Sequence, residues 1–276
     1  MSRASERVFI IGVGKVGRGL FAALKAEGSR VAIVSAREFA AQPAFVRGDV
    51  VVIAARDGAI VEIVRALIEG KSLRADSVVV HCAGSLDAEV LAPLRPWCAG
   101  VAQMHPMMSF ANPARPPALA GGHVHVDGDD EAVRRAKRVC RSLKLIPRTF
   151  PGLDRVAYHA AAGLVANGAA ALAACGAELL VKAGADPREV PAMLGPLLRS
   201  VAENVAVMGL PSALTGPVRR GDAKALSKHI ATLREKAPEL VEIYVACAKA
   251  QLPMARAIGE ATPAQLAEMT RLLGHG

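Results

Sequence analysis

Aromatic residues are scarce in this sequence of 276 residues, because Phe, Trp and Tyr together make up only 3% of it. Ala, Val and Leu must therefore fill the core. The net charge is +9, but Lys and Arg are scattered along the chain without neighbouring aromatics. A nucleic-acid-binding protein would gather both on one element, so that class is disfavoured. The charge surplus instead favours an anionic substrate or a phosphorylated cofactor.

Cysteine pairs, apolar runs of membrane-spanning length and low-complexity segments are also missing. The five cysteines lie far apart, without zinc-ligand spacing or a disulfide framework. This predicts free thiols in a reducing compartment and no metal site. The N-terminal stretch MSRASERVFI has no long apolar run before a cleavage site, and we find no apolar run of about 20 residues elsewhere. We therefore expect a soluble, cytoplasmic protein that does not enter a membrane.

What the sequence does contain is a series of short runs rich in β-branched residues, which predict strands. The first five are nearly uniformly apolar, as expected of strands covered on both faces, and stretches with helical spacing separate the early ones. Repeated strand–helix–strand units predict an α/β fold with a doubly wound parallel sheet. The runs cover residues 7–13, 30–35, 49–55, 77–83, 100–106, 123–128 and 145–150.

The pattern changes near residue 150, after which we find no convincing strand. We therefore predict two domains, an α/β domain over 1–152 and an all-α domain over 153–276. The first helix of the second domain is apolar on nearly every face, so it is either central or covered by another subunit. We expect a homodimer formed through this domain; a monomer with a simple helical cap is the alternative. The predicted helices cover residues 153–184, 187–208, 222–236, 238–257 and 263–273.

Three glycines in the order G-x-G-x-x-G follow the first predicted strand and open a helix. The first allows a tight turn, the second leaves the backbone open to a pyrophosphate, and the third lets the helix pack closely on the strand. The helix amides that follow can face the phosphates. We therefore predict dinucleotide binding by Gly12, Gly14, Lys15, Val16 and Gly17.

The end of the second predicted strand bears on which dinucleotide is bound. An NAD site usually places Asp or Glu there, but this chain reads Val-Ser-Ala-Arg before Glu38. Ser35 can donate to a 2′-phosphate and Arg37 can pair with it, which favours NADP over NAD. The alternative is that Arg37 is an ordinary surface residue. Ala55, at the end of the third strand, completes the predicted cofactor contacts.

Two further strand ends carry polar residues at the edge where open α/β sheets bind ligands. His105, in MHPMMSF, could exchange a proton with the oxygen or nitrogen of a reacting C–O or C–N bond, or be a structural histidine bonded to the backbone. Ser85 could orient a substrate carboxylate or cap a helix starting at Leu86. His81 lies inside a strand, which favours a structural role.

The stretches GVGKVGRGL, HCAGSLDAEVLAPLR, QMHPMMSF, YHAAAGLVANGAAAL and ALTGPVRRGD carry a resemblance over residues 12–222. The chain resembles bacterial Rossmann-like oxidoreductases with a C-terminal helical domain of unknown function, distant relatives of pyrroline-5-carboxylate reductase, ketopantoate reductase and 6-phosphogluconate dehydrogenase. The resemblance implies an NADP-linked fold with a dimerising helical domain, but no substrate. The HPM segment is also similar to the one that carries the catalytic His in prephenate and arogenate dehydrogenases, which favours a chemical role for His105.

One departure from the related dehydrogenases concerns a catalytic Lys that they place four residues before an Asn on the first helix after the nucleotide domain. The matching positions here are Gly163 and Asn167, so the Lys is absent. His159 stands one turn earlier on the same helix face. We expect His159 or His105 to provide the proton and Asn167 to orient the substrate, unless His159 and Asn167 satisfy each other inside the bundle. Tyr158 points about 100° away from that face.

The stretch LTGPVRRGD (214–222) is a Gly/Pro-rich connection between helices, with Asp222 placed to cap the next one. If it faces the cleft, Thr215 and Arg219 bind an anionic substrate; otherwise it is an interhelix turn. The leading hypothesis is an NADP-dependent oxidoreductase acting on a small anionic oxo, hydroxy or imino compound. The alternatives are a non-catalytic protein that responds to NADP, which the missing Lys favours, and a prephenate- or arogenate-like dehydrogenase.

Overall fold

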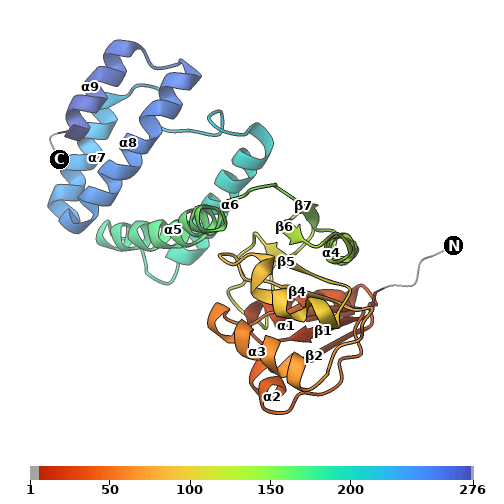
Figure 1. Ribbon diagram of the computed structural model, residues 1–276. Coiled ribbons are helices and arrows are strands. Elements are labelled where there is room, and N and C mark those ends of the chain that lie inside the picture. The colour runs from red at the N-terminus through yellow and green to blue at the C-terminus, as the bar shows by residue number, and fades with distance from the viewer. Residues whose placement is uncertain (1–5, 275–276) are drawn as a thin grey trace. The chain divides into compact units, whose positions relative to one another are not determined.

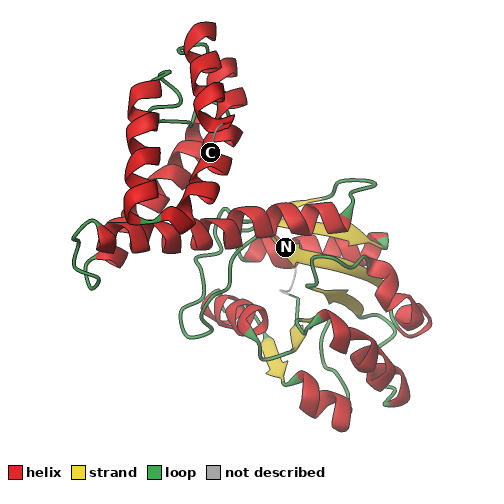
Figure 2. Cartoon of the chain, turned by 90° about the vertical axis from the view of Figure 1, so that its left-hand side faces the viewer, coloured by secondary structure: helices red, strands yellow, loops and turns green. Residues whose placement is uncertain are grey.

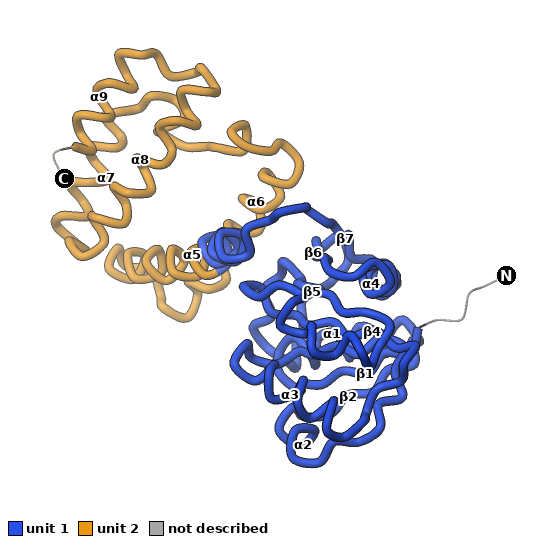
Figure 3. Tube along the Cα trace, viewed as in Figure 1, with its two compact units in different colours: residues 1–166 blue, residues 167–276 orange. Residues whose placement is uncertain are grey.

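The computed structural model describes residues 6–274, and the chain forms two compact units, residues 1–166 and 167–276 (Figure 3). Strands lie in the first unit, while the described part of the second is helical with connecting turns (Figure 2). The division falls inside helix α5 (Arg155–Lys182), so the predicted boundary at residue 152 stays a prediction. The first five residues of the N-terminal stretch lie outside the described range, and the expectation about a leader is untested.

The first unit is built on a sheet with the strand order β2-β1-β3-β4-β5-β6-β7 (Figure 1). All neighbouring strands run parallel except β5 and β6, which are antiparallel. A parallel connection needs a crossover, usually a helix, and no helix joins these two strands. The doubly wound sheet is confirmed, with this one reversal. Its strands are β1 (Val8–Ile11), β2 (Val31–Val34), β3 (Val50–Ile53), β4 (Val78–His81), β5 (Gly100–Pro106), β6 (His123–Gly128) and β7 (Ile146–Arg148).

Helices cover both faces of this sheet, so alternate residues of the central strands enter two different cores. Val50 and Val52 of β3 belong to the core that also contains residues of α1 and α4. Val51 and Ile53 belong to the core shared with α2, α3 and η1. Burial on both faces explains why these strands are apolar throughout. The helices are α1 (Lys15–Ala26), α2 (Ala36–Ala41), α3 (Asp57–Glu69), the 3₁₀ helix η1 (Ala88–Trp97) and α4 (Asp130–Ser142).

The second unit has its main core among α7, α8 and α9, where Leu226, Met269 and Leu273 are fully buried. Asp222 caps α7 by accepting a hydrogen bond of 3.0 Å from the Ala225 amide, as predicted. The elements after α5 are α6 (Val190–Met208), α7 (Ala223–Lys236), the 3₁₀ helix η2 (Pro238–Leu240), α8 (Val241–Ile258) and α9 (Pro263–Gly274).

Helix α5 differs from the rest because none of its residues, all within the described range, is buried. Leu164 is 78% and Val165 73% exposed. The helix is long and apolar enough to cross a membrane by length and composition. The sequence expectation overlooked it because Tyr, His and Asn interrupt the apolar run. Length and composition alone are weak evidence for a membrane span. An exposed apolar surface of this kind marks a site of interaction with another protein or with a membrane.

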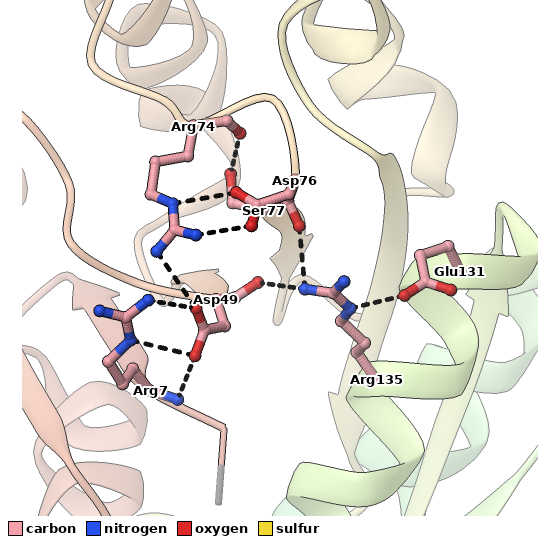
Figure 4. A network of polar contacts seen from close by, with 7 residues as sticks. All are labelled: Arg7, Asp49, Arg74, Asp76, Ser77, Glu131 and Arg135. Atoms are coloured by element: carbon pink, nitrogen blue, oxygen red, sulfur yellow. Dashed lines mark hydrogen bonds and ion pairs between the residues drawn. The ribbon is translucent and has the colours of Figure 1, made fainter. Parts of the chain in front are cut away.

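At the amino ends of the strands, a polar network joins several segments (Figure 4). The Asp49 carboxylate accepts hydrogen bonds from Arg7, at 2.7 Å from Nη2 and 3.1 Å from Nε, and lies 3.4 Å from Arg74. Arg135 of α4 donates to the backbone oxygens of Asp49 and Asp76 at 3.4 and 2.9 Å. The network ties β1, β3, β4 and α4 together at the edge opposite the carboxyl ends of the parallel strands, so its role is structural.

We expect Asp49→Asn to destabilise the protein at neutral pH. Hydrogen bonds from Arg7 lower the pKa of Asp49 from 3.8 to about 2. The stabilisation is therefore present above pH 3.8 and lost as the pH falls toward 2. After discounting for solvent screening, we expect a loss of about 1–2 kcal/mol in the free energy of unfolding. Urea denaturation at pH 7 and pH 3 checks this. Glu62→Gln, at an exposed residue of α3 outside this network, serves as control, and an equal loss from Asp49→Asn at both pH values would contradict the assignment.

Candidate active site

The three glycines after β1 have three different surroundings. Gly12 has a φ of 129°, and a Cβ there would lie 2.2 Å from the Ala54 carbonyl oxygen. A Cβ on Gly17 would lie 1.9 Å from the carbonyl oxygen of Gly12. Gly14, by contrast, has no heavy atom within 4 Å of its Cβ position. The first and third glycines thus permit close packing of the protein on itself, while the second leaves open space above the loop.

Helix α1 begins directly after this open position, with Gly14 as a cap residue that has no side chain to satisfy the helix amides. The amides of Lys15, Val16 and Gly17 are therefore the ones that can receive an anion. Ala55 follows the end of β3, which pairs with β1 on the side away from β2. The loop thus lies at the point where the strand order reverses, which is where open sheets of this class bind ligands. The cradle fits the pyrophosphate of a dinucleotide.

The end of β2 carries Ser35 and Arg37. Ser35 is the N-cap residue of α2, but its hydroxyl makes no capping hydrogen bond. Arg37 lies in the first turn of α2 and is exposed. Both side chains are thus placed where a ligand oxygen could reach them, and no carboxylate precedes Glu38. The exposure of Arg37 is equally consistent with an ordinary surface residue.

His105, near the carboxyl end of β5, has a defined hydrogen-bond partner. Its Nδ1 lies 2.9 Å from the carbonyl oxygen of Cys82. A carbonyl can only accept, so Nδ1 donates and Nε2 carries the free lone pair. Burial lowers the pKa of His105 below its usual 6.5. The imidazole is therefore neutral at pH 7 and presents a basic nitrogen.

The backbone of Gly84, in the turn after β4, lies between two histidines. A Cβ on Gly84 would be 3.0 Å from Nε2 of His105 and 2.3 Å from Nδ1 of His159. The two imidazole rings have centroids 5.8 Å apart at 75°. His159 stands in the first turns of α5, within the first unit. The structure thus brings together the two histidines that we selected as proton-transfer candidates.

Tyr158 joins this cluster, although its direction on the helix had excluded it from the face of His159. Its ring packs edge-on against His105 with centroids 5.6 Å apart, and lies 5.7 Å from the ring of His125. Side chains at successive helix positions diverge, but here they straddle the same imidazole. Burial raises the pKa of Tyr158, so its phenol is protonated at neutral pH and can donate a proton or a hydrogen bond.

Ser85 does not cap the following helix. Its hydroxyl donates to Asp57 Oδ2 at 2.7 Å, and Asp87 caps η1 by accepting from the Glu89 amide at 3.0 Å. With its hydrogen given to Asp57, the hydroxyl cannot also donate to a substrate carboxylate as predicted. Its oxygen keeps lone pairs for a substrate donor. His81 has the predicted structural role, because it accepts from the Ala83 amide at 3.2 Å and donates to the Asp87 carbonyl at 2.8 Å.

The remaining predicted residues belong to the second unit. Asn167 lies on α5, two turns after His159, and is exposed, as is Thr215. The guanidinium of Arg219 binds Glu260 at 3.0 and 2.7 Å and donates to the carbonyls of Ser212 and Leu214 at 2.9 and 2.8 Å. These bonds give Arg219 a structural role, because they join its loop to Glu260. Substrate binding by Asn167, Thr215 and Arg219 stays a prediction.

Comparison with known proteins supports the same architecture. Residues 123–251 match the model of a domain of unknown function (DUF2520). TM1727 from Thermotoga maritima shares 23% identity, with 91% of this chain and 98% of that chain covered and a TM-score of 0.67. The predicted resemblance is confirmed.

Two further solved structures extend this likeness. BF3122 from Bacteroides fragilis, a candidate NADP oxidoreductase, shares 22% identity over 90% of this chain and 98% of its own, with a TM-score of 0.68. The pyrroline carboxylate reductase of Plasmodium falciparum, with NADP bound, shares 12% identity over 94% and 100%, with a TM-score of 0.56. At these identities the likeness establishes the fold. No curated protein sequence matches the chain.

Proposed function

We propose that the protein is an NADP-dependent oxidoreductase that acts on a small anionic oxo, hydroxy or imino compound. The observation that carries the proposal is the open cradle at Gly14, at the start of α1, combined with a neutral imidazole at the same sheet edge. The likeness to an NADP-bound reductase and to BF3122 supports the cofactor class.

In this proposal the cofactor supplies the hydride chemistry, and the chain supplies binding and proton transfer. The amides at the start of α1 hold the phosphates, and Ser35 and Arg37 receive the 2′-phosphate. Nε2 of His105 takes a proton from the substrate oxygen or nitrogen during oxidation, or returns it during reduction. His159 and Tyr158, which pack edge-on against the His105 ring, hold the polar end of the substrate, and Ser85 offers an acceptor to it.

The activity is tested by following NADPH absorbance with 2-oxo acids and cyclic imines, and NADP with 3-hydroxy acids, prephenate and arogenate. Turnover of any of these supports the proposal and identifies the substrate class. Tight NADP binding without turnover across the panel would instead favour the non-catalytic NADP-responsive protein, which the missing Lys at Gly163 favours.

We expect Arg37→Ala to weaken NADP binding about 10- to 100-fold and to leave NAD binding within about twofold. A charge-assisted bond to the 2′-phosphate contributes about 1.5–3 kcal/mol, and NAD lacks that group. Fluorescence titration of both cofactors measures the two dissociation constants. Arg30→Ala, at an exposed arginine just before β2, serves as the control. Equal NAD and NADP affinities in the wild type would refute the preference.

We also propose a homodimer in which α5 and α6 are covered by a second copy. No Asp, Glu, Lys or Arg occurs between Arg155 and Glu178, and Leu164, Val165 and Leu197 are each more than half exposed. We expect light scattering to give twice the 28.7 kDa chain mass. Leu164→Glu should shift it to the monomer, whereas Val61→Glu, at an exposed valine of α3, should not. A monomeric wild type that pellets with liposomes would mean that lipid covers the helix instead.

A further inference from the structure

A row of polar side chains, of which His81, Gln103 and His125 are buried, crosses β4, β5 and β6 on one face of the sheet. The registers pair His81 with Gln103, Gln103 with Asp127, and His105 with His125. Residues two apart on a strand point to the same face, so all of these side chains share it. Gln103 is 0% and His125 2% exposed. Such burial of polar groups is costly unless every group finds a partner.

Gln103 spends both of its amide hydrogens on one turn of the chain. Its Nε2 donates to the carbonyl oxygens of Ala83 at 2.8 Å and Leu86 at 2.7 Å, and lies 3.3 Å from that of Gly84. Those oxygens can only accept, so the NH₂ group must face them and Oε1 must face the other way. The turn 83–86 carries Gly84 and Ser85, so this one buried amide fixes the position of a segment that lines the candidate site.

The orientation of that amide is set in turn by a histidine and an arginine. Oε1 of Gln103 accepts from Nδ1 of His125 at 3.1 Å. Nε2 of His125 therefore carries the lone pair and accepts from the Phe150 amide at 3.4 Å. The Arg155 guanidinium lies 3.5 and 3.3 Å from the two ring nitrogens and also binds the Asp127 carboxylate. Arg155 is the first residue of α5, one turn before Tyr158. Polar contacts thus run from the start of α5 through His125 and Gln103 to the turn 83–86.

We propose that Gln103 is a positioning residue, oriented by His125, that fixes the turn 83–86 and so holds Gly84 against Nε2 of His105. The catalytic role of this arrangement rests on the proposed function. The hydrogen bonds themselves are present in the protein without a ligand. Within residues 6–274 no group of three or more His, Cys, Asp or Glu side chains could hold a metal ion. His81, His105 and His125 each have the hydrogen-bond partners described above.

The test measures how readily His105 reacts with diethyl pyrocarbonate, which modifies a free imidazole lone pair. In Gln103→Met, a side chain of similar length without donors, the freed carbonyls turn toward water and the turn opens. We expect the rate at His105, followed by peptide mass spectrometry, to rise at least about threefold, because both hydrogen bonds that hold the turn are lost. His229, in the other unit, is the internal reference. Ser77→Ala, a buried serine at the opposite end of β4, is the matched control.

A second variant keeps the proposal testable if Gln103→Met does not fold. His125→Leu removes the donor to Gln103, so we expect the same direction of change, transmitted through the amide. In ¹⁵N spectra of the histidine rings, the Nδ1–H form of His125 should be present in the wild type and in Ser77→Ala and lost in Gln103→Met. An unchanged or lower His105 rate in the folded variants would overturn the positioning role.

The proposed function is judged separately, by NADPH binding to the wild type. A wild type that does not bind NADPH would sink the proposed function, whatever the reactivity of His105. A wild type that binds NADPH, with His105 equally reactive in Gln103→Met and in Ser77→Ala, would sink only the positioning role.

Discussion

Gly14→Val should abolish cofactor binding while leaving the fold intact. Gly14 has a φ of −71° and a ψ of −174°, which any residue can adopt, and its Cβ position has no neighbour within 4 Å. A valine there fits the unliganded protein but fills the space above the α1 amides. We expect the Kd for NADPH to rise at least about 100-fold, or ~2.7 kcal/mol. The free energy of unfolding should change by less than about 1 kcal/mol.

Gly17→Ala is the matched contrast, because its Cβ would stand 1.9 Å from the Gly12 carbonyl oxygen. That overlap forces α1 away from β1, so we expect a loss of about 1–3 kcal/mol in stability, as for other overpacked sites. Thermal melting and NADPH titration of both variants measure the two effects side by side. If Gly14→Val binds NADPH as well as the wild type, the cradle is not the phosphate site.

The glycine loop could be predicted from the sequence because its determinants are local. Strand, turn and helix follow one another between Val8 and Ala26. Gly17 meets the carbonyl of Gly12 in its own loop, and Gly14 meets nothing within 4 Å. The same holds for Asp222, whose capping partner is only three residues away. Hydrophobic periodicity and turn chemistry carry this information directly.

The hydrogen bonds that fix the turn 83–86 could not be predicted in that way. Gln103 reads as one polar residue in an apolar strand, and its importance comes from the antiparallel register of β5 with β6. His125 meets it only through that register, and Arg155 contacts His125 from the start of α5. Arg219 shows the same limit, because Glu260, which binds it, lies 41 residues further along the chain. A single sequence does not specify which distant strands or loops become neighbours.

His105→Gln should leave NADPH binding within about twofold and lower turnover about 10²- to 10⁴-fold, the usual contribution of a positioned proton-transfer group. The variant keeps a polar side chain of similar length but lacks a basic nitrogen. Steady-state kinetics on whichever panel compound reacts would measure the loss. His229→Gln, at a surface histidine bonded to Tyr244, is the control. Unchanged turnover in His105→Gln, with a large loss in His159→Gln, would move the proton-transfer role to His159.

The pH dependence gives this assignment a second, independent readout. Burial places the pKa of His105 below 6.5, and oxidation requires the neutral imidazole to accept the proton. The oxidation rate should therefore be full at neutral pH and fall as the pH drops through that lowered pKa, whereas reduction should show the opposite limb. In His105→Gln this pH dependence should disappear from both the oxidation rate and the reduction rate. If it persists in the variant, another group titrates, and His159 beside Gly84 becomes the first to test.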